Sequence, residues 1–249
     1  MEFICRPPAS CGVIRRMARL PRIVVPGIPN HIWIRGNDRQ AIFRSVGDRT
    51  YFRRCVLEMS REHGVDIHAY AWMTNHVHLL VTPAHANSLA KMVQGVGRRY
   101  VPYFNFLYER TGTLWEGRFG SCPVESERYF LVCHRYVELN PVRADFVGDP
   151  GAYEWSSFRC NAFGARDELV TPHSLYMELG GNDARRHAAY RSQFASDLDG
   201  PTLDAIRHAA RHGWALGGDE FCEFLEAKVN RPAKPRPRGP LAGINSTGV

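Results

Sequence analysis

The order in which strand-like and helix-like apolar patterns follow one another constrains this chain more than any other feature. Period-two alternation predicts strands at Arg22–Val25 together with His31–Arg35, at Val65–Met73, at His76–Thr82 and near Ser121–Val124. Spacing of three to four residues predicts helices at Asp48–His63, Ser88–Tyr108 and Ser126–Leu139, with Asp48 and Ser126 as N-caps. Between the second and third strands, Thr74 and Asn75 fit the tight turn of a hairpin.

The resulting order is strand, helix, strand, strand, helix, strand, which is the split pattern of ferredoxin-like domains. One further helix follows the last strand. We therefore predict an α+β fold, in which helices pack on one face of a ferredoxin-like antiparallel sheet. A helical C-terminal extension completes the chain.

Composition changes along the chain and suggests four segments. Residues 1–16 are an Arg-rich leader that lacks the apolar core of a secretory signal. The main domain is expected at residues 17–160, closed by a packed segment at 155–158, and a helical extension at 161–230. Helical patches within the extension are expected at Ala184–Phe194, Leu203–Arg211 and Glu220–Val229. Residues 231–249 mix Arg and Lys with proline, which predicts a basic disordered tail.

The charge balance favours a polyanionic partner. Lys and Arg outnumber Asp and Glu by 32 to 25, a formal net charge of +7, which suits nucleic acid first and acidic membrane surfaces second. No apolar run approaches the length of a membrane span, so no membrane partner is expected. The seven cysteines are scattered without a CxxC pair, which indicates reduced thiols in the cytoplasm.

The sharpest local motif is Asn75-His76-Val77-His78. Alternate side chains of a strand share a face, so His76 and His78 are expected side by side, with Val77 turned into the core. Two neutral imidazoles at this spacing can bind one divalent metal ion. The alternative is a pair of solvent-facing histidines on a half-buried strand.

A second motif, Tyr136-Val-Glu-Leu-Asn140-Pro, ends the predicted helix at 126–139. Tyr136 and Asn140 are four residues apart and should stack on one face of the last turn. Asn140 can offer an amide oxygen to the same metal ion, with Tyr136 beside it. The alternative is an ordinary helix end, in which the tyrosine packs and the asparagine stops the helix before proline.

Aromatic and basic residues interleave after the hairpin, as in proteins that bind unpaired bases. In the second strand, His68, Tyr70 and Trp72 are expected to share one face. The alternative for each of these residues is a core aromatic or a surface arginine with a packed stem. The candidate DNA-binding residues are Arg35, Arg98, Arg99, Tyr103, Trp115, Arg118 and Arg143.

Five motifs occur together in one order, and jointly they resemble the REP-associated tyrosine transposases. They are the run Met17 to Gly27, His31 with Arg35-Gly36-Asn37, Met73 to Leu79, Leu114 to Phe119, and Tyr136 to Arg143. That family is a branch of the single-tyrosine HUH transposases of bacterial insertion sequences, where HUH denotes His, a hydrophobic residue, His. The resemblance covers roughly residues 17–158, and it suggests that residues 1–16 precede the true start.

The resemblance implies a transposase-like enzyme that cleaves single-stranded DNA near palindromic hairpins and is able to rejoin strands. It carries over Tyr136 as nucleophile, through a 5′-phosphotyrosine intermediate, and His76, His78 and Asn140 as ligands of Mg²⁺ or Mn²⁺. The implied location is the cytoplasm, at the nucleoid, as a monomer or homodimer.

Two other functions remain open at the level of sequence. One is a catalytically inert single-stranded nucleic-acid-binding or regulatory protein on the same fold. The other is a replication initiator or relaxase with the same HUH chemistry, although the chain carries no GxxxxGK[ST] motif of a helicase.

Overall fold

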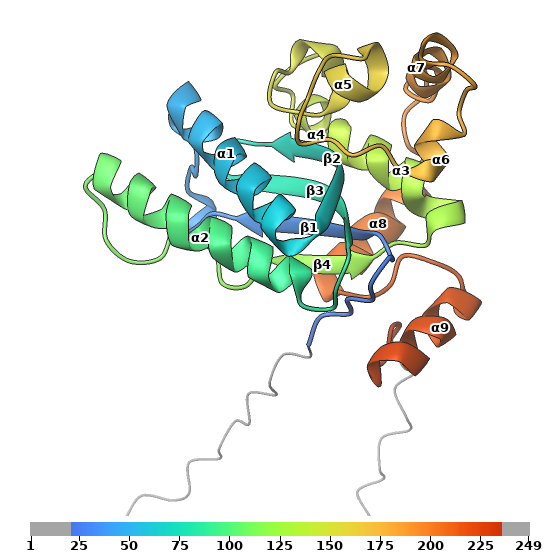
Figure 1. Ribbon diagram of the computed structural model, residues 1–249, viewed down its shortest axis with the longest axis horizontal. Helices are drawn as coiled ribbons and strands as arrows, with labels where there is room; N and C mark the ends of the chain where they lie inside the picture. The colour runs from blue at the N-terminus through green and yellow to red at the C-terminus, as the bar shows by residue number, and fades with distance from the viewer. Residues whose placement is uncertain (1–20, 236–249) are drawn as a thin grey trace, which may run out of the picture.

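A four-stranded antiparallel sheet forms the centre of the protein in our computed structural model, which describes residues 21–235 (Figure 1). Its strands are β1 (Asn30–Arg35), β2 (Val65–Trp72), β3 (His76–Pro83) and β4 (Gly120–Pro123), in the order β2-β3-β1-β4. This order follows from the predicted sequence of elements, and the ferredoxin-like α+β fold is confirmed. The expected segment 1–16 and the residues 236–249 lie outside the described part of the chain.

The first strand is shorter than predicted. Only Asn30–Arg35 pairs with other strands, whereas Arg22–Val25 has no strand conformation. Ile23 and Val25 instead pack against Leu225 of helix α9 (Asp219–Val229). The strand prediction was therefore wrong for Arg22–Val25, because three consecutive apolar residues indicate burial without distinguishing a strand from another buried segment.

Helices α1 (Val46–His63) and α2 (Ser88–Leu107) cover one face of the sheet (Figure 1). The start of α1 differs from the prediction. Ser45 is the N-cap, and Asp48 is the third helical residue, whose carboxylate accepts from the backbone N–H of Ser45 while the Ser45 hydroxyl accepts from that of Asp48. This capping box satisfies two donors of the helix end that would otherwise lack partners.

The opposite face of the sheet is also covered, which corrects the prediction of helices on one face only. Helix α3 (Ser126–Glu138) and helix α8 (Gly200–His212) pack there with the short helix α4 (Asn140–Arg143) following α3 (Figure 1). Leu80 and Cys122 of the sheet meet Phe130 and Ile206 of these helices. The predicted helical extension, through α8, thus supplies part of the helical layer on this second face of the sheet.

The 3₁₀ turn η1 (Asn37–Arg39) directly follows β1, and its Asn37 N–H donates to the Leu114 carbonyl. The remaining elements surround the end of α3 and the outer edge of β2. They are the 3₁₀ turn η2 (Pro150–Ala152) and the helices α5 (Phe158–Phe163), α6 (Ser174–Met177) and α7 (Asp183–Ser192). The segment at 155–158 packs against β2 as expected, since the Trp155 carbonyl accepts from the Trp72 N–H at 2.8 Å. No helix within residues 21–235 is both long and apolar enough to cross a membrane.

A β-bulge in β2 overturns the expected common face of His68, Tyr70 and Trp72. The pairing of β2 with β3 shifts between Ile67 and Ala69, so one residue is inserted and the alternation changes phase. Tyr70 and Trp72 belong to the core under α1 and α2, whereas His68 contacts Phe130 on the other face. All three side chains are buried and unable to stack on bases.

The burial of His68 predicts an acid-sensitive fold. Burial lowers the pKa of His68 to about 4, whereas an unfolded histidine titrates near ~6.5. The unfolded chain therefore binds more protons below ~6.5, and the stabilising contribution of neutral His68, complete above that pH, is lost as pH falls toward 4. Between pH 7 and 5, we expect His68 to account for about 2 kcal/mol of lost unfolding free energy.

Urea unfolding at both pH values, for the wild type and His68→Gln, measures this contribution. The variant should lose less stability than the wild type between pH 7 and 5. Comparing the two slopes removes the opposite contribution of Glu138, whose pKa burial raises to about 7. Equal slopes in the two proteins would contradict the assignment.

The beginning of the predicted disordered tail is ordered. Arg231 is buried and donates to the carbonyls of Pro21 and Gly213, and the Ala233 N–H donates to Glu226 at 2.7 Å. The Ala233 carbonyl in turn accepts from Ala215. Residues 231–235 are therefore packed, and the prediction was wrong for them.

Candidate active site

His76 and His78 lie at the start of β3, and their side chains project from the face of the sheet that α3 covers. The side chains of His76 and His78 flank Val77, which is fully buried under α1 and α2. The two imidazole rings lie 5.0 Å apart between centroids at an interplanar angle of 89°. The expected pairing of these two imidazoles on one face is therefore present.

The Nδ1 atom of each ring lies within hydrogen-bond distance of a polar neighbour. His76 Nδ1 is 2.7 Å from Asn75 Oδ1, an oxygen that only accepts, so Nδ1 carries the proton and Nε2 keeps its lone pair. His78 Nδ1 is 2.9 Å from His31 Nε2. Neither Nε2 has a hydrogen-bond partner among the described residues. This is the arrangement that metal-binding histidines use, with the second nitrogen fixed by a polar neighbour.

Burial keeps both imidazoles neutral. It lowers the pKa of His76 to about 4, with a smaller contribution from the positive charge of Arg35. Burial likewise lowers the pKa of His78 well below its ordinary value, and the neighbouring His31 and His76 lower this pKa further. A neutral imidazole is the form that coordinates metal, so the two side chains fit a divalent cation.

His31 of β1 is a site residue that the functional assignment from sequence missed. It is buried, its ring stacks on His78 at 5.1 Å between centroids, and its Nδ1 has no hydrogen-bond partner among the described residues. Burial lowers its pKa to about 3. Its signal in the sequence is its place in the motif of His31 with Arg35-Gly36-Asn37, whereas its contact with His78 depends on the pairing of β1 with β3.

Tyr136 lies beside these rings in the last turn of α3. Its ring centroid is 5.6 Å from that of His31 and 6.1 Å from that of His78, with nearly perpendicular ring planes. The side chain is 9% exposed, so it is packed on the histidines but still reaches the surface. The hairpin and the helix end, about sixty residues apart in the sequence, thus meet as predicted.

Asn140 follows one turn later and closes the end of α3. Its side-chain amide donates to the carbonyls of Tyr136 and Val137, each at 3.0 Å. Both amide hydrogens are therefore used by the helix end, while the amide oxygen accepts no hydrogen bond from the described residues. An oxygen presented in this way fits the expected third metal ligand.

Arg143 covers the ring of Tyr136. The guanidinium carbon lies 4.3 Å from the ring centroid, and Nη2 donates to the Tyr136 carbonyl. Nη1 is buried without a partner among the described residues, so this cation retains a free donor. Burial raises the pKa of Tyr136, and the charge of Arg143 opposes that rise.

The other candidate DNA-binding residues are divided among three places. Arg35 and Arg118 line a cleft next to the histidines, whereas Trp115 and Arg98 line an apolar groove of about 740 Å³ over α2. Tyr103 packs on Tyr51 at 4.3 Å between ring centroids, within the α1–α2 layer. Only Arg143 contacts Tyr136 directly.

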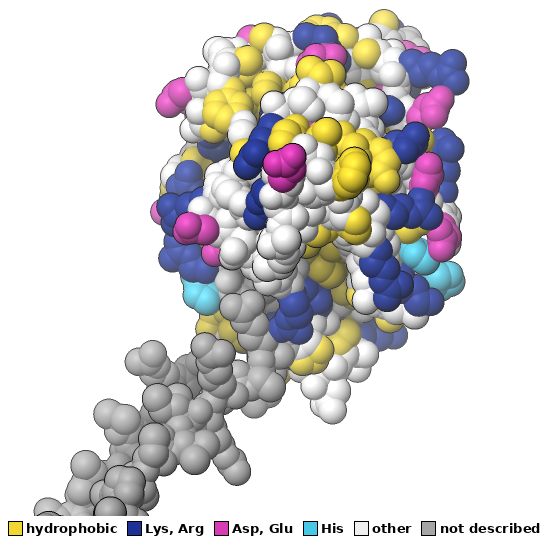
Figure 2. Space-filling model, turned by 90° about the vertical axis from the view of Figure 1, so that its left-hand side faces the viewer, with side chains coloured by type: hydrophobic (Ala, Val, Ile, Leu, Met, Phe, Trp, Pro, Cys, Tyr) yellow, Lys and Arg dark blue, Asp and Glu magenta, His cyan; other side chains and the backbone are white. Residues whose placement is uncertain are grey.

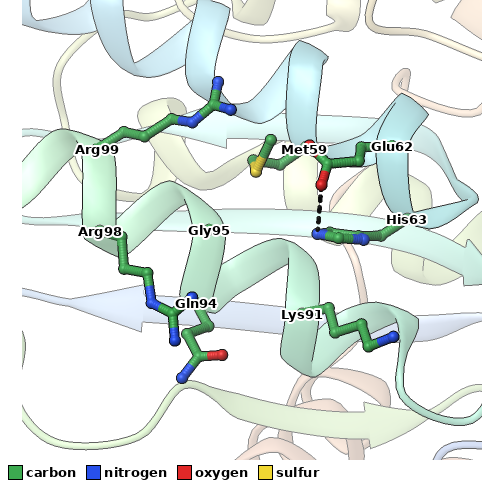
Figure 3. A pocket seen from close by; sticks show the side chains of 8 residues that line it. All are labelled: Met59, Glu62, His63, Lys91, Gln94, Gly95, Arg98 and Arg99. Atoms are coloured by element: carbon green, nitrogen blue, oxygen red, sulfur yellow. Dashed lines mark ion pairs between the residues drawn. The ribbon is translucent and has the colours of Figure 1, made fainter.

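Arg98 and Arg99 face away from the histidines. Figure 3 shows them on α2, at a pocket of about 430 Å³ between α1 and α2. Lys91 and the ion pair of Glu62 with His63 lie at the same pocket. Arg99 forms an ion pair with Glu58. On the face in Figure 2, Lys and Arg are spread out with acidic residues between them. The basic charge there forms no single patch.

Within residues 21–235, no group of three His, Cys, Asp or Glu side chains is placed to hold a metal ion. The candidate ligands expected from the sequence have a different composition: two histidines on β3 and an amide oxygen from α4. The five cysteines in the described part of the chain are free thiols.

The histidine pair on the sheet and the tyrosine at the end of α3 are among the motifs on which the resemblance to the single-tyrosine transposases rests. Residues 25–140 match the family described as "Transposase IS200 like". The family consists of transposases, enzymes that cleave and move DNA, and its members generally use a divalent metal.

The fold is similar to that of a solved REP-associated tyrosine transposase bound to a REP hairpin. The TM-score is 0.51 at 18% identity, over 64% of this chain and 96% of that chain. A candidate transposase from Deinococcus radiodurans R1 aligns at 22% identity over 49% of this chain and 96% of that chain, with a TM-score of 0.34. No curated protein matches the sequence. The resemblance inferred from the five motifs is confirmed for family and fold.

Proposed function

We propose that this protein cleaves single-stranded DNA near palindromic hairpins, with Tyr136 as the nucleophile and a 5′-phosphotyrosine as the intermediate. The observation that carries the proposal is the contact of Tyr136 with the histidine rings of the sheet, with Asn140 one turn away. Such a group combines a nucleophile with ligands for a cation, which phosphodiester transfer requires.

His76, His78 and Asn140 would hold Mg²⁺ or Mn²⁺, which when bound polarises the scissile phosphate as a Lewis acid. The phenol of Tyr136 loses its proton to solvent, and its oxygen forms a bond to phosphorus. The bond from phosphorus to the 3′-oxygen breaks, and this oxygen takes up a proton to leave as a hydroxyl. Arg143 offers positive charge to the phenolic oxygen and a free donor to the phosphate.

The phosphotyrosine conserves the energy of the broken phosphodiester. A second 3′-hydroxyl can therefore attack it and rejoin strands without ATP. Hairpin DNA is a reasonable substrate because the similar solved transposase is bound to a REP hairpin. A single strand suits the site, because Tyr136 lies at a mostly buried position that a rigid duplex does not reach.

Loss of one histidine should abolish tight metal binding. We expect His76→Ala to weaken Mn²⁺ binding by at least about 100-fold, since one of two imidazole ligands is removed. Isothermal titration calorimetry measures the affinity without DNA. His85→Ala is the matched control, because His85 is exposed in the segment just before α2, and it should bind as the wild type does. Unchanged affinity in His76→Ala would place the metal elsewhere.

The function itself is tested with labelled single-stranded hairpins taken from beside the gene that encodes the protein. Wild-type protein should form a DNA–protein adduct that survives denaturing electrophoresis in Mn²⁺ and is absent in EDTA. Hairpin binding without adduct or cleavage, across metals and substrates, would instead indicate the inert binding protein.

A further inference from the structure

A cleft of about 580 Å³ lies beside the histidines and has no role in the chemistry above. One wall is the β1–β4 edge of the sheet with the segment leading into β4. The other is the end of α8 with the residues that follow it, joined by Arg231. The side chains used below are Trp33, Phe119, Trp214, Arg22, Arg118 and Arg211.

Trp33 connects the cleft to the candidate active site. It pairs with His78 across β1 and β3, and its ring centroid is 5.5 Å from that of His31. The indole lies flat against Gly120, where a Cβ atom would come within 1.9 Å of it. The missing side chain at position 120 thus lets an indole line the cleft immediately next to the histidines.

Trp214 lies across from this wall, directly after α8. It is half-buried and lines the same cleft, while the guanidinium of Arg231 lies 5.6 Å from its ring centroid. Phe119 contributes a third aromatic ring, with the Arg22 guanidinium 3.5 Å from its centroid. Half-buried aromatic rings in an open cleft offer faces on which unpaired bases stack.

The cleft carries positive charge with little compensation. Its one acidic residue, Glu116, is engaged in an ion pair with Arg35. Arg118 and Arg211 are exposed and form no ion pair within the described residues. Burial lowers the pKa of Arg22 to about 10, and repulsion from Arg118 adds to that effect. Like charges gathered in this way favour an anionic occupant.

We propose that this cleft binds the unpaired DNA segment next to the scissile phosphate. Bases stack on Trp33 and Trp214, and the backbone phosphates pair with Arg118 and Arg211. The occupant is a single strand because stacking on an indole requires a base face that a duplex keeps inside. This proposal rests on the proposed function for the position of the cut, but the binding itself requires neither Tyr136 nor metal.

Fluorescence anisotropy with a labelled oligo-dT of about 12 nucleotides, in EDTA, measures this binding without cleavage. We expect Trp214→Ala and Trp33→Ala each to weaken binding about tenfold, as loss of one stacked base does. Arg118→Gln and Arg211→Gln should each reduce the slope of log affinity against log salt by about 0.7. Arg54→Gln, an exposed arginine on α1, is the control and should leave both quantities unchanged.

Wild-type affinity and salt slope in both Trp214→Ala and Arg211→Gln would overturn the proposal. An equal loss of affinity for a duplex of the same length would overturn the single-strand assignment. Thermal melting identifies any variant that fails to fold. If Trp33→Ala fails to fold, the Trp214 and Arg211 variants still test the proposal, because both residues lie outside the sheet.

The same variants separate this proposal from the proposed function. If wild-type protein forms no adduct while the tryptophan variants lose affinity, the cleft stands and the tyrosine chemistry fails. If adduct forms and the variants bind oligo-dT as the wild type does, the chemistry stands and the cleft fails.

Discussion

Tyr136→Phe should abolish the covalent DNA adduct and reduce strand cleavage at least about a thousandfold, the scale on which removal of an enzymatic nucleophile acts. The substitution deletes only the phenolic oxygen. The ring keeps its contacts with His31 and His78 and its place under Arg143. Stability and DNA affinity should therefore remain near those of the wild type, which separates a chemical defect from a folding defect.

Single-turnover cleavage of a 5′-labelled hairpin strand, followed on denaturing gels, measures this effect. Tyr129→Phe is the matched control, because Tyr129 is a half-buried tyrosine two turns earlier on the same helix. It should cleave at the wild-type rate. Metal-dependent cleavage that persists undiminished in Tyr136→Phe would show that water is the nucleophile and that the protein is a hydrolytic phosphodiesterase.

The sheet could be predicted from sequence because its determinants are local. Alternation of polar and apolar residues defines β3, and the turn at Thr74 and Asn75 fixes its pairing with β2. The alternation of His76, Val77 and His78 likewise fixes which face the imidazoles occupy. Residues whose position depends on a strand's own periodicity were therefore placed correctly.

Features that depend on contacts between distant segments could not be predicted. His68 changes faces because of a bulge that leaves no mark in the sequence of β2. His31 becomes a site residue only because β1 pairs with β3, which places it against a residue 47 positions away. Arg231 resembles a tail residue in composition, yet it is buried by contacts with Pro21 and Gly213.

Glu138 is another residue whose role emerges only in three dimensions. It lies between Tyr136 and Asn140 in the sequence but points away from them, into a fully buried pocket. Its carboxyl group accepts from Ser157 at 2.5 Å, from Asn161 at 2.8 Å and from Tyr190 at 2.6 Å. The end of α3 is thereby tied to the segment along β2 and to helices α5 and α7. This tie fixes the turn that carries Tyr136.

Glu138→Ala should consequently lower the free energy of unfolding by about 3 kcal/mol, because Ser157, Asn161 and Tyr190 each lose a buried hydrogen bond to the carboxyl group. For a chain of this size, the corresponding fall in the melting temperature is about 6–12 °C. Burial raises the pKa of this carboxyl to about 7, so its neutral form is readily populated and an amide can substitute for it. Glu138→Gln keeps an oxygen for Ser157 and Asn161, so its unfolding free energy should fall by less than half as much.

Differential scanning calorimetry of the wild type, Glu138→Ala and Glu138→Gln distinguishes these cases. Equal melting temperatures for wild type and Glu138→Ala would mean that water or a neighbouring group satisfies the donors, and that the turn bearing Tyr136 is held by its apolar contacts with the sheet alone.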